Sequence, residues 1–156
     1  MSARSAGILA FRRRRGKIEV LLVHPGGPFW RNKDLGVWSI PKGEYGPSED
    51  PEAVARREFY EELGTEIGGK LSLLDEVRQR GGKLVKAFVI ESDVDVQNIR
   101  SNMFEIEWPP HSGRRQAFPE VDRAEWFDLP SARAKINEAQ RILLDRLETS
   151  AGTAKR

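Results

Sequence analysis

The feature of this sequence that most constrains its fold is an acidic segment, residues 43–65, whose second half has the properties of a helix. Asp50 is a favourable N-cap, and Pro51 suits the first helical position. Gly64 is a favourable stop, since glycine adopts the backbone conformation that ends helices. We therefore predict a helix that begins at Pro51 and ends just before Gly64.

Three glutamates on this predicted helix form an acidic stripe. Glu58, Glu61 and Glu62 stand at i, i+3 and i+4, so they share an arc of about 100° at 3.6 residues per turn. Like charges four residues apart cost about 0.2–0.5 kcal/mol, and the negative end of the helix dipole adds to the repulsion. A hard divalent cation bound by carboxylate oxygens would offset it. The stripe therefore indicates a site for Mg²⁺, with Mn²⁺ as a substitute.

A plainer interpretation is that this helix is a solvated face stabilised by ion pairs. Glu52 with Arg56, and Arg57 with Glu61, have the favourable i, i+4 order for such pairs. The stripe alone does not decide between the two interpretations.

The spacing of the residues around the stripe favours the functional interpretation. The segment has a fixed order of residues and gaps: Gly43, five residues, Glu49, seven residues, Arg57, Glu58, Phe59, one residue, Glu61, Glu62, one residue and Gly64. A combination of this kind arises by chance roughly once in 10⁹ starting points at average residue usage. It resembles the signature segment of the Nudix hydrolases. One position departs from the family pattern, because Thr65 stands where an aliphatic residue is usual.

The resemblance implies an α/β (α+β) fold, an α/β/α sandwich with a mixed central sheet, over nearly the whole chain. It also implies that the Gly43 carbonyl joins Glu58, Glu61 and Glu62 around the metal ion. Glu49 would act through Arg57, which we count among the catalytic residues, to fix the metal-binding carboxylates. Members of the family often use one more glutamate, shortly before a final strand that bears a tryptophan.

The best match to that additional glutamate is Glu120, six residues before Trp126. We expect Glu120 to act as a metal ligand or general base, with Glu105 and Glu107 as the reserve candidates. The alternative is that Glu120 is an ordinary loop carboxylate. Either Glu61 or Glu120 would take the proton from the attacking water, and the sequence does not decide which.

The loop from His24 to Gly36 is rich in glycine and proline and is a candidate substrate loop. Phe29 and Trp30 could stack on a nucleobase, and Arg31 and Lys33 could bind phosphates. Alternatively, the aromatic residues close the edge of the core. Lys42 precedes the signature segment directly, where its ammonium group could neutralise a phosphate oxygen. We expect His24 to be a structural residue.

Length and composition indicate one soluble domain. The 156 residues, 38% of them hydrophobic, suffice for one core, and we assign residues 1–149 to a single domain and 150–156 to a disordered tail. The net charge of +2 does not point to nucleic acid, and the chain lacks cysteine, which excludes disulfides and thiolate metal sites. No apolar run suggests a signal peptide or membrane span, so we expect a cytoplasmic protein.

The remaining elements follow from periodicity and turn signals. We predict a helical turn over 130–135, and a final helix that begins with a capping box at Asn137 and Gln140 and ends at Leu147. The predicted strands, besides the last one, which bears Trp126, cover 6–12, 18–24, 38–43, 70–78, 83–91 and 103–108.

Together these observations predict a metal-dependent pyrophosphohydrolase. Its substrate would be a nucleoside diphosphate linked to another group, such as a nucleoside triphosphate or dinucleoside polyphosphate. Arg80 and Gly81 stand where family subgroups often carry a Tyr or Pro, which argues against dinucleoside polyphosphates and ADP-ribose. Two alternatives stay open: hydrolysis at RNA 5′ ends, with RNA the less favoured partner, and a non-catalytic nucleotide-binding module.

Overall fold

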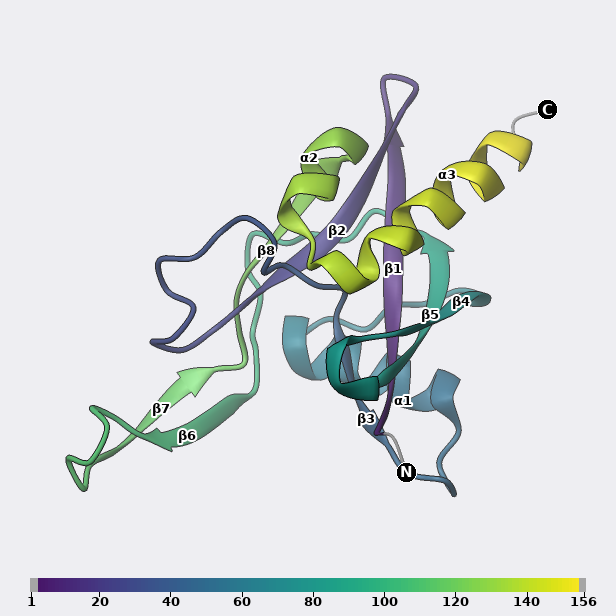
Figure 1. The fold of residues 1–156 in the computed structure, drawn as a ribbon. Helices are drawn as coiled ribbons and strands as arrows, with labels where there is room; N and C mark the ends of the chain where they lie inside the picture. Colours follow the sequence, from purple (N-terminus) through teal and green to yellow (C-terminus); the bar gives the residue numbers. More distant parts are fainter. Residues whose placement is uncertain (1–2, 155–156) are drawn as a thin grey trace.

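A mixed six-stranded sheet forms the centre of the protein. The computed structural model describes residues 3–154, and Figure 1 shows the long strands β1 and β2 crossing the molecule. The strand order is β4-β5-β1-β2-β8, and β3 pairs with the first part of β1. Among the strand pairs of this sheet that the structure describes, β1–β5 is parallel and the others are antiparallel. The strands are β1 (Arg4–Arg14), β2 (Lys17–Pro25), β3 (Lys42–Tyr45), β4 (Ser72–Arg78), β5 (Leu84–Glu91) and β8 (Val121–Asp128).

Helix α1 (Pro51–Leu63) forms as its capping residues predict. The Asp50 side chain accepts a hydrogen bond from the Ala53 backbone N–H at 3.1 Å, and Pro51 occupies the first turn. Gly64 ends the helix in the left-handed conformation with φ 77°, and its N–H donates to the Tyr60 carbonyl oxygen. The expected boundaries are confirmed.

Helices cover both faces of the sheet, which confirms the expected mixed α/β architecture (Figure 1). On one face, Phe59 and Leu63 of α1 pack with Ile8 and Leu21 of the first two strands. On the other, α2 (Leu129–Lys135) and α3 (Arg141–Ala154) pack over Leu9 and Leu22. The apolar residues that pack on this face from α3 and from the C-cap of α2 are all buried: Ile136, Leu143, Leu144 and Leu147. Each face therefore buries an apolar layer, the main source of folding free energy.

A two-stranded arm projects from this body (Figure 1). It consists of β6 (Met103–Glu107) and β7 (Arg115–Pro119), paired antiparallel with Phe104 opposite Phe118. We expected β6, but not β7, since Arg115 to Pro119 lacks the run of β-branched residues that marks a strand. The register of β6 places Glu105 and Glu107 on the exposed face of the arm.

The C-terminal helix is longer than expected. Two short 3₁₀ turns, η1 (Arg80–Gly82) and η2 (Glu138–Gln140), lie in the loops, and η2 leads directly into α3. Asn137 caps η2 by accepting from the Gln140 N–H at 3.2 Å. Helix α3 continues beyond Leu147 to Ala154, and Ala151 is buried against the sheet. Residues 150–154 are therefore helical, in contrast to the disordered tail expected for 150–156, while 155–156 lie outside the described residues. Across residues 3–154, we find no helix with the length and apolarity needed to cross a membrane.

Candidate functional site

The acidic stripe of α1 faces the sheet edge where β3 begins. Glu62 is buried, with 7% of its surface exposed. Glu58 lies against Gly43: a Cβ atom on Gly43 would be 1.9 Å from Glu58 Oε1. Only glycine leaves room for the Glu58 carboxylate at this point. The signature glycine therefore allows β3 and α1 to approach closely enough for backbone and carboxylates to share one site.

Burial and crowding shift the ionisation of two stripe carboxylates. Burial raises the pKa of Glu62 to about 8, and the charges of Glu58 and Glu120 act in the same direction. Burial raises the pKa of Glu58 to about 7, assisted by a hydrogen bond and charge repulsion from Glu61. Both carboxyls are therefore protonated well above the usual range for glutamate when no cation is present.

Lys42 is the cation that acts on the buried Glu62. Its backbone N–H donates to Glu62 Oε2 at 3.3 Å, and burial lowers the pKa of its ammonium group, while the Glu62 charge opposes that shift. One lysine therefore faces several carboxylates in a partly dehydrated space. This leaves an excess of negative charge at the site.

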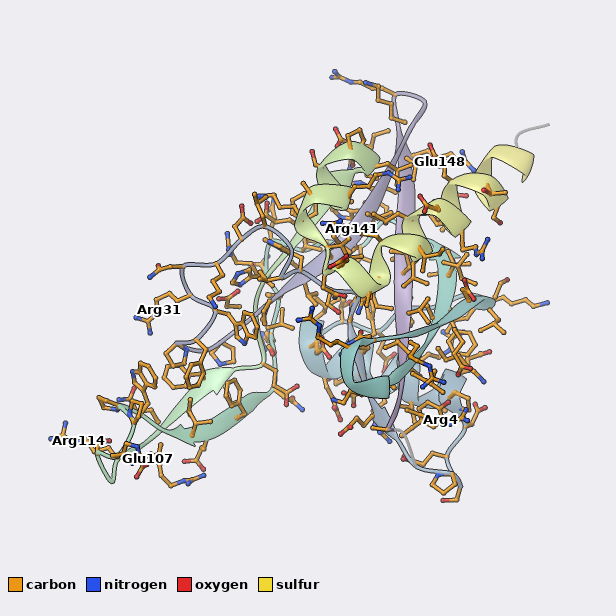
Figure 2. The ribbon with its side chains drawn as sticks, viewed as in Figure 1. Arg4, Arg31, Glu107, Arg114, Arg141 and Glu148 are labelled. Carbon is orange, nitrogen blue, oxygen red and sulfur yellow. The ribbon has the colours of Figure 1, made fainter. Side chains whose placement is uncertain are left out.

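The structure places Glu120 beside the stripe through a chain of backbone hydrogen bonds. The Asn102 N–H donates to the Glu61 carbonyl oxygen at 2.7 Å, and the Glu120 N–H donates to the Asn102 carbonyl oxygen at 2.8 Å. Burial raises the pKa of Glu120, and the Glu61 charge adds to the effect. Glu107, in contrast, accepts from the backbone N–H groups of His111 and Gly113 at the tip of the β6–β7 arm. Figure 2 shows Glu107 there, away from the body of the molecule.

The backbone of the candidate substrate loop is joined to Glu120. The Gly26 N–H donates to the Glu120 carbonyl oxygen at 2.9 Å. A Cβ atom on Gly26 would be 1.9 Å from the Pro119 carbonyl oxygen, so the two segments are in direct backbone contact. The position of Glu120 is therefore fixed by both the α1 end and the substrate loop.

Arg57 and Glu49 form the ion pair that the resemblance implies. Arg57 Nη1 donates to Glu49 Oε2 at 3.2 Å, and Arg57 Nε lies 3.7 Å from Glu58 Oε2 and 3.9 Å from Glu61 Oε1. Glu49 Oε1 accepts from the Gly46 N–H at 2.9 Å, and this hydrogen bond and the Arg57 partner lower the Glu49 pKa. Arg57 thus connects the signature loop with two stripe carboxylates.

The donor chemistry of this group suits a hard divalent ion. Oxygen ligands are what Mg²⁺ prefers, and the crowded glutamates with raised pKa values would be stabilised by such a charge. In residues 3–154, however, no three His, Asp or Glu side chains already converge into a complete ligand set. Side-chain rotation of the stripe glutamates would have to accompany ion binding.

Two adjoining pockets open at the site. The acidic pocket, of about 210 Å³, is lined by Lys42, Glu62 and Glu120 among others. The wide pocket, of about 1000 Å³, shares Pro25, Val37, Ser39 and Lys42 with it. A substrate that occupies the acidic pocket can therefore extend into the wide pocket past Lys42.

The predicted substrate-loop residues do not all face this space. Trp30 lines the wide pocket, with Lys33 Nζ 5.4 Å from its ring centroid. Phe29 packs edge-on against Trp108 of the arm, with ring centroids 5.3 Å apart. Arg31 and Lys33 line a separate hollow. Of the four, Trp30 is the one placed to contact a ligand in the wide pocket.

His24 has the structural role expected of it. It is fully buried, its Nε2 donates to the Lys33 carbonyl oxygen at 2.6 Å, and its Nδ1 lies 2.8 Å from Asp122 Oδ1. These contacts attach the substrate loop to β8.

Sequence reasoning missed most residues that line the wide pocket. They come from distant segments and include Ser39, Arg78, Gln79, Arg80 and Asn137. No spacing rule brings these residues together, because the parallel β1–β5 pairing and the docking of η2 bring their segments close. The signal that could have been noticed is Gln140, a polar residue next to the apolar face of the final helix.

Comparisons with known proteins agree with this architecture. The family model described as NUDIX domain matches residues 1–147, and a comparison with curated proteins found no match. A C. elegans Ap4A hydrolase in a binary complex is 24% identical, with 99% of each chain covered and a TM-score of 0.65. The NUDIX domain of Shewanella oneidensis NrtR, complexed with ADP ribose, is 15% identical, covering 97% of this chain and 89% of that one at a TM-score of 0.67. The MutT protein from Methanosarcina mazei Go1 is 18% identical, with 96% of this chain and 95% of that chain covered and a TM-score of 0.61. These likenesses show a shared fold.

Proposed function

Because the chain belongs to the Nudix family and is on that ground a hydrolase of pyrophosphate bonds, we propose that it requires a divalent metal ion and cleaves a nucleoside diphosphate linked to another group. Nudix hydrolases generally use such ions, commonly Mg²⁺. The substrates we favour are a nucleoside triphosphate or, although Arg80 and Gly81 replace the Tyr or Pro of family subgroups, a dinucleoside polyphosphate. The solved relatives include an Ap4A hydrolase and a domain complexed with ADP ribose, which supports a nucleotide derivative as the ligand.

The observation that carries this proposal is the excess of carboxylates beside Lys42. Glu58, Glu62 and Glu120 all have raised pKa values because they are partly or largely buried near one another. Such an arrangement lowers the stability of the protein at neutral pH without a cation, which favours a functional role for these carboxylates. A bound divalent cation would supply the missing positive charge, for these carboxylates and for a substrate phosphate beside them.

Each residue of the site has a proposed role. Glu58, Glu61, Glu62 and the Gly43 carbonyl would hold the metal ion, with Glu120 as an additional ligand. When bound, a divalent ion neutralises phosphate charge and lowers the pKa of water. Arg57, held by Glu49, orients Glu58 and Glu61, and Lys42 neutralises a phosphate oxygen. Glu61 or Glu120 accepts the proton of the water that attacks phosphorus in line.

A nucleotide panel with product identification tests the proposal. We expect Mg²⁺-dependent release of a nucleoside monophosphate or inorganic pyrophosphate from at least one nucleoside diphosphate derivative, and no release after Glu61→Gln. Binding without turnover across the panel would instead support a non-catalytic nucleotide-binding module. A 5′-triphosphorylated RNA belongs in the panel: faster conversion than free nucleotides, with a steep loss at higher salt, would establish RNA as the substrate.

A further inference from the structure

The charged side chains that line the wide pocket are mostly cationic. Lys42 lies where this pocket adjoins the acidic pocket, and Arg78 and Arg80 also line it. One carboxylate, Glu138, faces the same space. Cationic side chains therefore outnumber carboxylates by three to one in the wide pocket, the reverse of the balance around the stripe.

Both arginines are available to a ligand. Within residues 3–154, neither Arg78 nor Arg80 forms an ion pair, whereas Arg4, Arg12, Arg56, Arg57, Arg133 and Arg146 are all paired. Arg78 Nη1 donates to the Gly82 carbonyl oxygen at 3.3 Å. For Arg80, the described structure contains no side-chain hydrogen bond. Their guanidinium groups therefore retain donors suited to phosphate or carboxylate oxygens.

The turn that carries these arginines has a defined conformation. The Gln79 N–H donates to the Lys83 carbonyl oxygen at 2.6 Å, and the Gly82 N–H donates to the Gln79 carbonyl oxygen at 3.0 Å. Gly81 and Gly82 have φ values of 86° and 88°, the left-handed region that glycine favours. The turn is therefore formed by its own backbone, independently of any ligand.

The buried Gln140 side chain joins this turn to the segment before β3, which leads into the acidic pocket. Gln140 is 0% exposed, and its Nε2 donates to Gln79 Oε1 at 3.1 Å and to Ser39 Oγ at 3.0 Å. Its Oε1 accepts from the Ile40 N–H at 3.0 Å, two residues before Lys42. The two sources of positive charge are thus held relative to each other before a ligand binds, which lowers the entropic cost of binding.

We propose that the wide pocket binds the part of the substrate beyond the scissile phosphoanhydride, and that Arg78 and Arg80 select a part that is itself anionic. Trp30 offers an aromatic face in the same pocket. The inference rests on the proposed function, because the acidic pocket must hold the scissile bond for the distal part to reach the arginines. A neutral sugar would leave both guanidinium groups without a ligand, whereas phosphates beyond the scissile bond supply acceptors.

Diadenosine polyphosphates with two to five phosphates test this proposal, because the ends stay constant while the charge between them grows. With Mg²⁺, we expect kcat/KM to rise about tenfold or more from the shortest to the preferred longer substrate. Arg78→Gln and Arg80→Gln should each raise KM for the longer substrates about tenfold, with little change in kcat and little effect on the shortest. Arg80→Lys, which keeps the charge, should retain part of the preference.

The matched control is Arg114→Gln. Arg114 is an exposed arginine without an ion pair in the described structure, and Figure 2 shows it at the end of the β6–β7 arm. It should leave the whole series unchanged. Equal effects of Arg80→Gln on all chain lengths, or no effect on any, would overturn the inference.

A binding measurement separates failure of this inference from failure of the proposed function. Calorimetry with methylene-bridged analogues of the same series requires no turnover. If no substrate is hydrolysed, yet the longer analogues bind about tenfold more tightly and lose this advantage in Arg80→Gln, the proposed function fails and the assignment of the wide pocket as an anion-binding pocket stands. Affinity that is independent of chain length would overturn the pocket even if hydrolysis occurs.

Discussion

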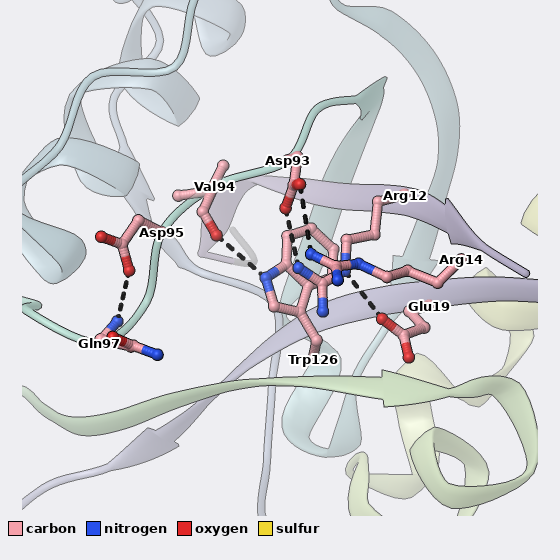
Figure 3. A network of polar contacts seen from close by, with 8 residues as sticks. All are labelled: Arg12, Arg14, Glu19, Asp93, Val94, Asp95, Gln97 and Trp126. Carbon is pink, nitrogen blue, oxygen red and sulfur yellow. Dashed lines mark hydrogen bonds and ion pairs between the residues drawn. The ribbon is translucent and has the colours of Figure 1, made fainter.

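Two clusters centred on arginines differ in their charge balance: in one, positive and negative side chains match, and in the other, carboxylates are in excess. In the first, Arg12 donates to Glu19 and Asp93, each at 2.8 Å, and stacks over the Trp126 ring at 4.3 Å (Figure 3). Arg14 lies 3.5 Å from the same Asp93. In the second, Arg57 lies among Glu49, Glu58 and Glu61, with Glu62 and Glu120 close behind.

The difference appears in the direction of the pKa shifts. The hydrogen bond from Arg12 lowers the pKa of Asp93, so the cluster stabilises the charged form of that carboxylate. At the α1 site, burial and mutual repulsion raise the pKa values of Glu58, Glu62 and Glu120. Balanced charges fasten the segment after β5 to the sheet, whereas unbalanced charges mark a place that a cation can complete. The predictions below test this contrast, from the largest expected effect to the smallest.

The largest effect is expected for Glu62→Gln or Glu61→Gln. Loss of a proposed metal-binding carboxylate should lower Mg²⁺-dependent turnover on the order of 10³-fold, because charge neutralisation at phosphorus would be lost. Turnover is measured on the best substrate of the nucleotide panel, and circular dichroism checks the fold. Asp93→Asn in the Arg12 cluster is the matched control and should leave turnover within about twofold of the unmodified protein. Unaltered turnover rates in both glutamate variants would contradict the proposed metal site.

Glu120→Gln should have the next largest effect. We expect turnover to fall about 10²-fold, the contribution typical of a positioned proton acceptor. Glu107→Gln, at the tip of the arm, should have little effect on the same assay. The reverse ranking would assign the additional carboxylate to the arm.

Removal of Arg57 should weaken metal binding while the fold persists. Arg57→Gln frees Glu58 and Glu61 from their common partner, so we expect a 10- to 100-fold loss in Mg²⁺ affinity by titration calorimetry. Arg12→Gln should lower the free energy of unfolding by about 1–3 kcal/mol without changing that affinity. An Arg57 variant that affects only stability would make Arg57 a scaffold residue.

The smallest effect is a pH dependence of stability in metal-free protein. The pKa of Glu62 rises from 4.5 to about 8 on folding, so its contribution is fully present below pH 4.5 and is lost as the pH rises through about 8. Unfolding measured by denaturant between pH 5 and 8 should therefore show declining stability, and Glu62→Gln should reduce the decline. Asp93 has a lowered pKa, so its contribution is lost only as the pH falls below the ordinary value of 3.8. A stability profile that Glu62→Gln leaves unchanged would contradict the assignment.

Local signals in the sequence were sufficient for α1 and its acidic stripe. The caps at Asp50 and Gly64 act within a few residues of the helix, and the i, i+3, i+4 spacing fixes which side chains share a face. Glu120 could be identified only through the resemblance, and its placement depends on hydrogen bonds through Asn102 that no sequence pattern encodes. For the same reason the family and fold were predictable, while the chemistry of the substrate was not.

The residues of the wide pocket needed the tertiary structure. Gln79 and Gln140 are 61 positions apart, and the hydrogen bond between them depends on the packing of η2 near the turn after β4. In the candidate substrate loop, the sequence suggested more contacts with the wide pocket than the structure shows. Composition suggested that four of its side chains face the ligand, but Phe29 turns to the arm, and Arg31 and Lys33 line another hollow. Composition indicates what a loop can bind, whereas its anchors, such as His24, determine which side chains face the site.

The backbone contact between Gly26 and Pro119 has a mechanical consequence. With no side chain between them, the segment after β2 and the end of β7 are in direct backbone contact, so a displacement of Gly26 would also displace the backbone of the neighbouring Glu120. A Gly26→Ala substitution would place a Cβ atom against the Pro119 carbonyl oxygen and force the two segments apart, although every acidic side chain of the site would remain. The activity would then depend on a backbone contact that contributes no reactive group of its own.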